Sequence, residues 1–363
     1  MICTPAPRSR PFAHLTDTAP SGAFVVGGSR ATANSRGTDE SNGVQVLAQR
    51  SVPDQFGPLA RILADPAVTD AFVNAAGDVW VVRGCGVEPL LALRLEPDEV
   101  RRLAVRLVAL GGRHVDEATP CADVRLADGL RVHVVLPPVA RDGTVLSVRA
   151  PRVGILRLDD LDDGRYFSFV DREVVERLVA RRANLLITGA AGTGKTTLLA
   201  ALLSGAPPTE RIVTIEDVAE LRVDHPHVVA LETRQANLEG AGRIDLARLV
   251  REALRMRPDR LVVGECRGVE IRELLSALST GHDGGAGTLH ANGLDAVPAR
   301  LEALGALAGL TPESVARQAV SAFDAVLHLE AVPGDRGGTV RRIAGLASFT
   351  LDASGRLQVD AEG

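Results

Sequence analysis

The chain has 363 residues, which is enough for two domains of ordinary size. Hydrophobic residues make up 45% and charged residues 24%, and no stretch approaches the roughly 18–20 apolar residues of a membrane span. The net charge of −5 argues against a general nucleic-acid binder, which is usually basic. The N-terminus lacks the apolar segment of a secretory signal, so we expect the protein in the cytoplasm.

The cysteines are few and widely separated, and no two of them form a CxxC pair. This spacing predicts neither a zinc site nor a disulfide framework, and it favours free or buried thiols in a reducing compartment. Cys266, which follows an apolar run, is expected to be a small buried hydrophobic residue. The four cysteines are Cys3, Cys85, Cys121 and Cys266.

The first 150 residues divide into two parts of different composition. Residues 1–54 are rich in Ser, Thr, Gly, Ala and Pro, and they predict a disordered tail that buries too little surface to offset its ordering entropy. Residues 55–150 predict a small α+β domain, with Trp80 in its core. Its expected elements are a helical segment at 59–63, strands at 78–83, 123–126, 130–136 and 145–149, an amphipathic helix at 97–111 and a turn at 127–129.

The remainder of the chain begins with residues 151–183, which predict a linker with an acidic run and a lead-in helix at 172–182. Residues 184–363 alternate between strand and helix patterns, which predicts an α/β domain with a doubly wound, largely parallel sheet. Strands are expected at 184–188, 211–216, 227–232, 260–264, 286–289 and 325–330, with a terminal strand or hairpin at 340–360. Helices are expected at 195–204, 245–257, 268–279, 294–307 and 312–322.

A glycine-rich loop between the first of these strands and the first helix matches GxxxxGK(S/T). Its glycines let backbone N–H groups converge on phosphate oxygens, and the helix N-terminus adds partial positive charge. Lys195 is the single lysine among 41 basic residues, and a compact ammonium suits this loop where a planar guanidinium does not. We therefore predict an ATP site formed by Gly189, Ala190, Ala191, Gly192, Thr193, Gly194, Lys195, Thr196 and Thr197.

Two later strands end in acidic residues. One ends in Glu216 and the other in Glu265, and the carboxyl ends of strands are where ligands bind in open α/β sheets. An ordinary Walker B motif has Asp directly before such a Glu, but this chain has Gly264 there. A glycine-rich segment further along carries His282 and His290.

Four segments together resemble the type II/IV secretion system ATPases, most closely the CpaF/TadA group of tight-adherence pilus motors. They are GAAGTGKT, TIEDVAEL, RMRPDRLVVGECRG and TGHDGGAGTLHAN, in that order. The resemblance extends over about residues 57–330. It implies a RecA-like P-loop NTPase core preceded by the smaller α+β domain.

The resemblance also implies catalytic roles. Glu216 would be the general base that orients and deprotonates the attacking water, and Glu265 would hold Mg²⁺ through water together with Thr196. His290 would sense the γ-phosphate, with a hydrogen bond that changes when phosphate leaves. The alternative for each glutamate is that it caps a neighbouring loop.

Arginines are expected to complete the site. The resemblance places Arg131 and Arg149 of the small domain where arginines approach the nucleotide phosphates, and such residues can be worth ~10³–10⁵ in rate. The alternative is that both are surface residues of an arginine-rich chain. Arg234 and Arg267 are candidates to bridge acidic groups, and His282 either packs against its loop or contacts nucleotide.

The implied function is an ATP-hydrolysing motor that uses ATP and Mg²⁺. It would form a homo-hexameric ring at the cytoplasmic face of the inner membrane and act with platform proteins of a pilus or secretion system, without nucleic acid. Two alternatives are a nucleotide-gated scaffold with little turnover and a DNA-directed RecA-like motor. The intact Glu216 and Glu265 argue against the first, and the negative net charge argues against the second.

Overall fold

The computed structural model describes residues 51–83, 86–126, 129–150, 154, 156–162, 165–234, 241–334 and 339–362. Residues 1–50 of the predicted tail lie outside this set, as do Cys3, Cys85 and the first two positions of the predicted turn at 127–129. Within the described part of the chain, no helix combines the length and the apolar character needed to cross a membrane.

An antiparallel sheet with the strand order β3-β2-β1-β6-β5-β4 forms the framework of the region up to residue 150. Its strands are β1 (Val68–Val73), β2 (Asp78–Arg83), β3 (Gly86–Arg94), β4 (Cys121–Arg125), β5 (Arg131–Val135) and β6 (Val145–Arg149). The helices are η1 (Asp54–Phe56), α1 (Pro58–Leu63) and α2 (Pro97–Leu110). Buried side chains of α2 recur at helical spacing and join the core formed with the sheet, so the predicted α+β character is confirmed.

Two strands of this sheet, β1 and β3, were not expected from the sequence. β3 contains Pro89 and is largely exposed, as is typical of an edge strand, so it shows no regular burial pattern. The expectation that Trp80 lies in the core is wrong. Val79 and Val81 of β2 point into the core, whereas Trp80 is partly exposed on the other face, where it pairs with Phe72.

A second sheet, with the strand order β14-β13-β12-β7-β11-β10-β8-β9, forms the framework of residues 184–362. Its strands are β7 (Leu185–Gly189), β8 (Ile212–Glu216), β9 (Val228–Glu232), β10 (Arg260–Val263), β11 (Ala286–His290), β12 (Ala325–Pro333), β13 (Thr339–Leu351) and β14 (Leu357–Glu362). Pairing is parallel from β12 through β9, and β13 and β14 add an antiparallel hairpin at one edge. The predicted largely parallel sheet and the terminal hairpin are both confirmed.

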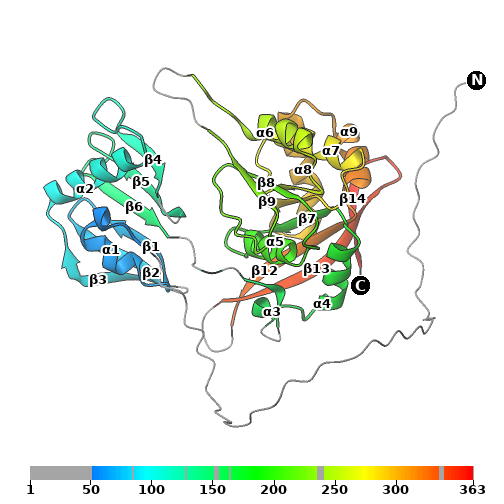
Figure 1. Cartoon of the computed structure of the whole chain (residues 1–363), viewed down its shortest axis with the longest axis horizontal. Helices are drawn as coiled ribbons and strands as arrows, with labels where there is room; N and C mark the ends of the chain where they lie inside the picture. Colours follow the sequence, from blue (N-terminus) through cyan, green and yellow to red (C-terminus); the bar gives the residue numbers. More distant parts are fainter. Residues whose placement is uncertain are drawn as a thin grey trace, which may run out of the picture. The chain divides into compact units, whose positions relative to one another are not determined.

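Helices cover both faces of this sheet (Figure 1). Alternate residues of β7 belong to different cores: Leu186 packs with α6 to α9, whereas Leu185 and Ile187 pack with α4 and α5. Burial on both faces explains the largely apolar runs that identified the strands. The helices are α3 (Leu158–Leu161), α4 (Arg172–Ala180), α5 (Lys195–Ser204), α6 (Leu246–Ala253), η3 (Leu254–Met256), α7 (Glu270–Ser279), η4 (Leu294–Ala296), α8 (Val297–Leu307) and α9 (Pro312–Ala322).

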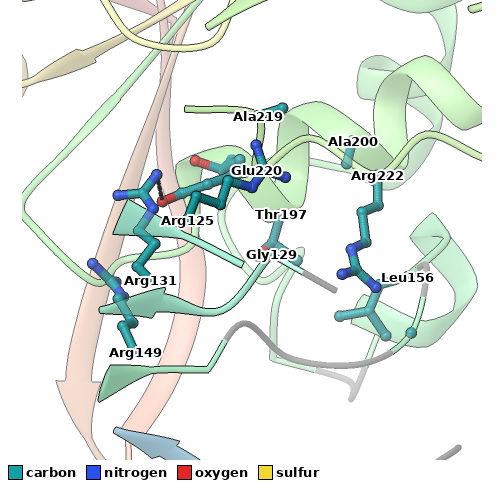
Figure 2. Close-up of a pocket in the computed structure, with 12 residues that line it drawn as sticks. Arg125, Gly129, Arg131, Arg149, Leu156, Thr197, Ala200, Ala219, Glu220 and Arg222 are labelled. Carbon is teal, nitrogen blue, oxygen red and sulfur yellow. Dashed lines mark ion pairs between the residues drawn. The ribbon is translucent and has the colours of Figure 1, made fainter. Parts of the chain in front are cut away.

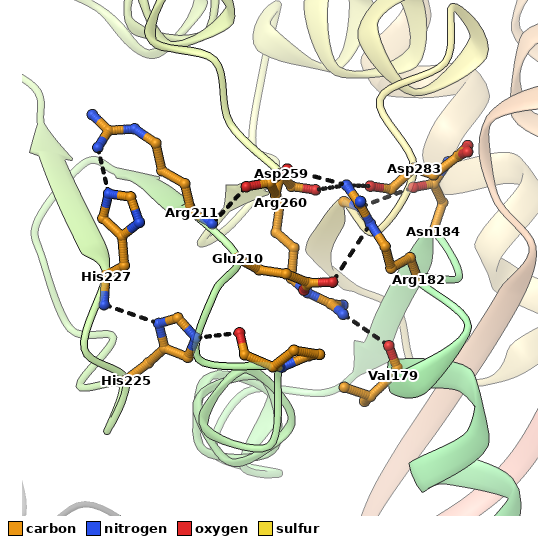
Figure 3. Close-up of polar contacts among 12 residues, drawn as sticks. Val179, Arg182, Asn184, Glu210, Arg211, His225, His227, Asp259, Arg260 and Asp283 are labelled. Atoms are coloured by element: carbon orange, nitrogen blue, oxygen red, sulfur yellow. Dashed lines mark hydrogen bonds and ion pairs between the residues drawn. The ribbon is translucent and has the colours of Figure 1, made fainter.

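The amino edge of the sheet, where β8 and β10 begin, carries a network of charged groups (Figure 3). Arg260 is 3% exposed, and its Nε lies 2.5 Å from a carboxylate oxygen of Glu210 while its Nη2 donates to the carbonyl oxygen of Val179. Arg182 donates to the carbonyl oxygen of Asp259, and the Asp259 carboxylate accepts from the Arg211 amide. Two of these contacts join the start of β10 to the end of α4, and the other two join the starts of β8 and β10, so the network holds the sheet and α4 together.

The carboxyl edge of the same sheet gathers a different set of residues. Because β7, β8, β10 and β11 are parallel, their C-terminal ends meet at one edge. Gly189, Glu216 and His290 end their strands there, and Glu265 follows β10 by two residues. The fold therefore brings together residues that are up to 101 positions apart in the chain.

Candidate active site

The predicted phosphate-binding loop joins β7 to α5. Gly192 and Gly194 have φ values of 76° and 96°, in the left-handed region that favours glycine, and Gly194 directly precedes α5. A Cβ atom on Gly189 would lie 2.6 Å from the carbonyl oxygen of Leu329. The turn therefore requires these glycines, and it leaves a side-chain-free cradle beside the partly positive N-terminal end of α5.

Lys195 is buried at the first position of α5, with only 6% of its surface exposed. Its Nζ donates to the carbonyl oxygens of Gly189 and Ala190, at 2.9 Å each, so both partners are uncharged. Burial lowers the pKa of Lys195 to about 8, although the nearby Glu265 carboxylate raises it. The ammonium is thus a buried charge whose direct acceptors are neutral, as expected for a group that binds an anion.

His290 lies between Lys195 and Glu265. Its Nδ1 is 3.4 Å from the Lys195 Nζ, and its Nε2 is 2.8 Å from Oε1 of Glu265. Because an ammonium only donates, these contacts assign Nδ1 as the acceptor and Nε2–H as the donor, which is the neutral imidazole. Burial, and then the charge of Lys195, lowers the pKa of His290, in agreement with this assignment.

Glu265 continues the chain of contacts. Its Oε2 accepts a hydrogen bond of 2.6 Å from the Arg267 guanidinium. Burial by itself would raise the pKa of Glu265, but the hydrogen bond and charge of Arg267, together with His290 and Lys195, outweigh burial and hold the pKa below its usual value. The structure therefore brings Lys195, His290 and Glu265 into one network, and Arg267 bridges to it as expected.

Glu216 occupies a separate place at the same sheet edge. It is 5% exposed, and its carboxylate accepts hydrogen bonds from the amides of Glu220 and Leu221, at 2.9 and 3.0 Å. Burial raises the pKa of Glu216 to about 6, although these backbone hydrogen bonds lower it. The carboxylate thus caps the loop that follows β8, which is the alternative left open by the sequence.

Gly264 explains the departure from an ordinary Walker B motif. A Cβ atom at this position would lie 2.6 Å from Cγ and 3.0 Å from Oε1 of Glu216. Any side chain at position 264 would therefore displace Glu216. The glycine and the glutamate form a matched pair, one providing the space that the other fills.

Four arginines line a cavity of about 250 Å³ that also includes Thr196, Thr197 and Glu220 (Figure 2). They are Arg125, Arg131, Arg149 and Arg222. Arg131 and Arg149 are paired in register on β5 and β6, so their side chains lie side by side. Arg131 forms an ion pair of 2.6 Å with Glu220, and Arg125 forms one of 2.8 Å with Glu232. Both arginines expected at the site therefore line the same cavity as Thr196 and Thr197 in the first turn of α5.

Three other expectations can be placed. His282 lies 3.3 Å from the carbonyl oxygen of Ala277, in the last turn of α7. Cys266 is 1% exposed, and burial raises the pKa of its thiol, which confirms a buried residue. The backbone of Arg234 forms an isolated bridge with Ile244.

Two residues at the site were not identified from the sequence. Glu270 is 5% exposed and accepts hydrogen bonds from the amides of Arg267 and Gly268, so it anchors the segment after Glu265 to the first turn of α7. Its position in a first helical turn was the available signal. Arg341 of β13 donates from Nε to the carbonyl oxygen of Gly192 at 3.1 Å, and nothing in the local sequence indicates this contact.

The oxygen donors at the site suit a Mg²⁺ ion that is also held by phosphate and water. Among the described residues, no three His, Cys, Asp or Glu side chains form a group that could hold a metal ion by themselves. Mg²⁺ usually keeps several waters and binds through one or two protein oxygens plus substrate phosphates, so an all-protein cage is not required. The hydroxyl of Thr196 at the cavity and the ionised Glu265 carboxylate fit that requirement.

Comparison with known proteins agrees with this geometry. The sequence model for type II/IV secretion system proteins matches residues 53–329. A protein named for conjugal transfer in Mycobacterium tuberculosis is 45% identical over 308 residues, covering 83% of this chain and 86% of the relative. VirB11 of Agrobacterium tumefaciens is 31% identical over 264 residues, covering 64% of this chain and 75% of VirB11.

Solved structures support the fold. The pilus retraction motor PilT, solved with bound ADP, superposes with a TM-score of 0.59 at 22% identity, over 84% of this chain and 82% of PilT. The predicted α/β fold, a RecA-like P-loop ATPase core with an N-terminal domain, is confirmed. The family match covers more than half of the chain and includes every motif that carried the resemblance. The chain belongs to the type II/IV secretion system protein family.

Proposed function

We propose that this protein is an ATP-hydrolysing motor of a pilus-assembly or secretion machine of the tight-adherence type, in the CpaF/TadA group. The observation that carries the proposal is the network of Lys195, His290 and Glu265 directly beside the glycine loop. In this network, Lys195 is a buried cation that could bind phosphate, His290 contacts that cation, and Glu265 is an ionised carboxylate that contacts His290. Family membership supports the same conclusion.

ATP would bind with its phosphates in the loop from Gly189 to Gly194. Lys195 would exchange its carbonyl acceptors for phosphate oxygens, because a charged acceptor forms the stronger hydrogen bond. His290 would then lose or reorient its contact with Lys195. Since Nε2 of His290 contacts Glu265, this change would reach the carboxylate directly.

Thr196 and Glu265 would hold Mg²⁺, the carboxylate through water. The ion supplies charge neutralisation of the β- and γ-phosphates when bound. Arg267 donates a hydrogen bond to one oxygen of Glu265 and favours the ionised carboxylate. The other oxygen of Glu265 can then accept hydrogen bonds from water.

Glu216 is proposed as the base that accepts a proton from the attacking water. A pKa of about 6 places this group close to neutral pH, where a base both ionises and accepts protons efficiently. To act, the carboxylate would release the amides of Glu220 and Leu221. Because Glu220 pairs with Arg131, the position of that arginine would influence the release.

Arg131 and Arg149 are proposed to neutralise charge on the transferred phosphoryl group. They share a cavity with Thr196 and Thr197, at the first turn of the helix that carries Lys195. An arginine supplied from another part of the protein makes hydrolysis depend on conformation, which is the requirement for a motor.

We propose a homo-hexamer, peripheral at the cytoplasmic face of the inner membrane, that acts on platform proteins and not on nucleic acid. We also propose that the chain divides into an N-terminal segment (1–54), a small α+β domain (55–150), a linker with a lead-in helix (151–183) and the ATPase domain (184–363).

The second candidate is a nucleotide-gated scaffold, which is favoured by the capping contacts of Glu216. The decisive comparison uses purified full-length protein, with phosphate release and hexamer content measured for the wild type and Glu216→Gln. A motor requires Mg²⁺-dependent turnover that falls by ~10²-fold or more in Glu216→Gln while ATP affinity is preserved. Negligible wild-type turnover with tight ATP binding would establish the scaffold instead. Equal turnover in both proteins would remove Glu216 from catalysis.

A further inference from the structure

The last hairpin of the chain reaches the phosphate-binding loop. β13 is separated from β7 by β12, yet the side chain of Arg341 extends to the loop that follows β7. Its Nε donates to the carbonyl oxygen of Gly192 at 3.1 Å, and its Cδ would lie 3.4 Å from a Cβ atom on Gly194. Arg341 therefore contacts both ends of the Gly192–Gly194 segment. Its apolar stem lies against Gly194, and its guanidinium donates to Gly192.

The contact determines how one peptide group of the loop is oriented. In a trans peptide, the C=O of one residue and the N–H of the next point in opposite directions. Because Arg341 holds the Gly192 carbonyl on its own side, the N–H of Thr193 is directed away from Arg341. Thr193 is 3% exposed, and its hydroxyl donates to the carbonyl oxygen of Ala190 at 2.9 Å.

The three loop carbonyls that accept these hydrogen bonds are thus each held by a donor from the protein. Lys195 holds Gly189 and Ala190, and Arg341 holds Gly192. A loop that binds phosphate through its amides needs its carbonyls turned elsewhere, since a carbonyl oxygen repels a phosphate oxygen. When Lys195 moves to a bound phosphate, Arg341 remains on the loop backbone.

The charge of Arg341 supports the same conclusion. The neighbouring residue, Arg342, is paired with Glu330 at 3.2 Å and lies 4.6 Å from the centre of the Phe169 ring. Within the described part of the chain, Arg341 forms no ion pair, although it is only partly exposed. A guanidinium without a carboxylate partner beside a phosphate-binding loop adds positive potential where the nucleotide phosphates would lie.

We propose that Arg341 is a positioning residue for nucleotide binding, which orients the Gly192–Thr193 peptide and adds positive charge beside the phosphate site. This inference rests on the proposed function as an ATPase. It assigns to the C-terminal hairpin a part in the affinity for ATP. Arg341 acts through the loop, so its loss affects KM more than kcat.

The test uses the full-length protein with Arg341→Met, Arg341→Lys and, as a matched control, Arg342→Met. Methionine keeps an apolar stem but removes the donor and the charge. Arg341→Met is expected to raise the KM for ATP by about 5- to 20-fold with kcat changed less than about twofold, as for loss of one charge-assisted hydrogen bond. Arg341→Lys keeps a positive donor and should recover part of that affinity.

Thermal unfolding with and without MgATP separates loop positioning from general stability. Arg341→Met should unfold near the wild-type temperature without nucleotide but show a smaller MgATP-induced rise. Arg342→Met should unfold at a lower temperature and keep the full rise. An unchanged KM and an unchanged MgATP-induced rise in Arg341→Met would refute the role of Arg341. Absence of any rise in the wild type would refute ATP binding itself, so the two failures are distinguishable.

Discussion

The two edges of the parallel sheet each bury a cation, but the close partner is a carboxylate at one edge and backbone carbonyls at the other. At the amino edge, Arg260 is 3% exposed and lies 2.5 Å from the carboxylate of Glu210, whose side chain is 12% exposed (Figure 3). At the carboxyl edge, Lys195 is 6% exposed, and its two close acceptors are carbonyl oxygens. Burial depresses the pKa of Lys195 to about 8.

This difference separates a structural charge from a functional one. A buried cation with a carboxylate partner has its desolvation cost partly offset by that partner, and removing one of the pair is destabilising. A buried cation with only neutral acceptors keeps an unfavourable desolvation free energy, and a bound anion offsets that free energy. The neutral acceptors of Lys195 therefore support the proposed phosphate site at the carboxyl edge by a route other than the sequence motif.

The largest expected effect is at Lys195. Lys195→Met should reduce ATP hydrolysis by at least ~10²–10³-fold, because the phosphates lose their principal cation. Lys195→Arg should not restore it, since a planar guanidinium does not fit the loop. In the free protein, Lys195→Met should leave the free energy of unfolding unchanged or higher, which urea unfolding will show. Turnover near the wild-type level in Lys195→Arg would contradict the geometric reason given for the single lysine.

Arg260 should give the opposite result. Arg260→Met removes the closer of the two cationic partners of Glu210 and leaves Arg182 at 3.8 Å, so we expect the free energy of unfolding to fall by about 1–3 kcal/mol. ATP affinity of the folded protein should not change. The double variant Arg260→Met with Glu210→Gln serves as the control and should recover part of the loss. If the free energy of unfolding of Arg260→Met fell by less than about 1 kcal/mol, the result would contradict the distinction between a structural and a functional edge.

Gly264 tests how tightly the carboxyl edge is packed. Gly264→Ala places a methyl group about 2.6 Å from Cγ of Glu216, so Glu216 must move. We expect a loss of about 1–3 kcal/mol in stability, as for other overpacked sites, together with roughly tenfold slower turnover. Gly86→Ala, where a Cβ meets no atom within 4 Å, is the control for the substitution itself. Normal turnover in Gly264→Ala would show that the position of Glu216 is not critical.

The smallest expected effect is on pH dependence. A lysine loses its proton as the pH rises through its pKa, and only the protonated form attracts phosphate. With a pKa of about 8 for Lys195, ATP affinity should fall about tenfold between pH 7.5 and 9, and binding near pH 8 should take up a proton. Isothermal titration calorimetry in buffers of different ionisation enthalpy measures both quantities. A flat profile over this range would place the pKa of Lys195 near that of an exposed lysine.

The elements of the α/β region were predictable because two independent signals coincide there. Strands β7, β8 and β10 are buried on both faces and appear as largely apolar runs, while helices α6 and α7 keep an apolar stripe. The antiparallel sheet was harder to predict. β3 is an exposed edge strand, and Trp80 lies on the face opposite the core, so hydrophobicity alone misplaced it.

The sequence by itself determined the phosphate loop, because the glycines and Lys195 that form it are consecutive and their spacing is imposed by backbone geometry. It also indicated that Glu216, Glu265 and His290 lie at one edge, since parallel strands end together. Only the tertiary structure decided which of these residues touch. Glu265 joins His290 and Arg267, Glu216 fills the space over Gly264, and Arg341 reaches Gly192 from a strand 149 residues later. These contacts depend on side-chain packing between distant segments, which no local pattern records.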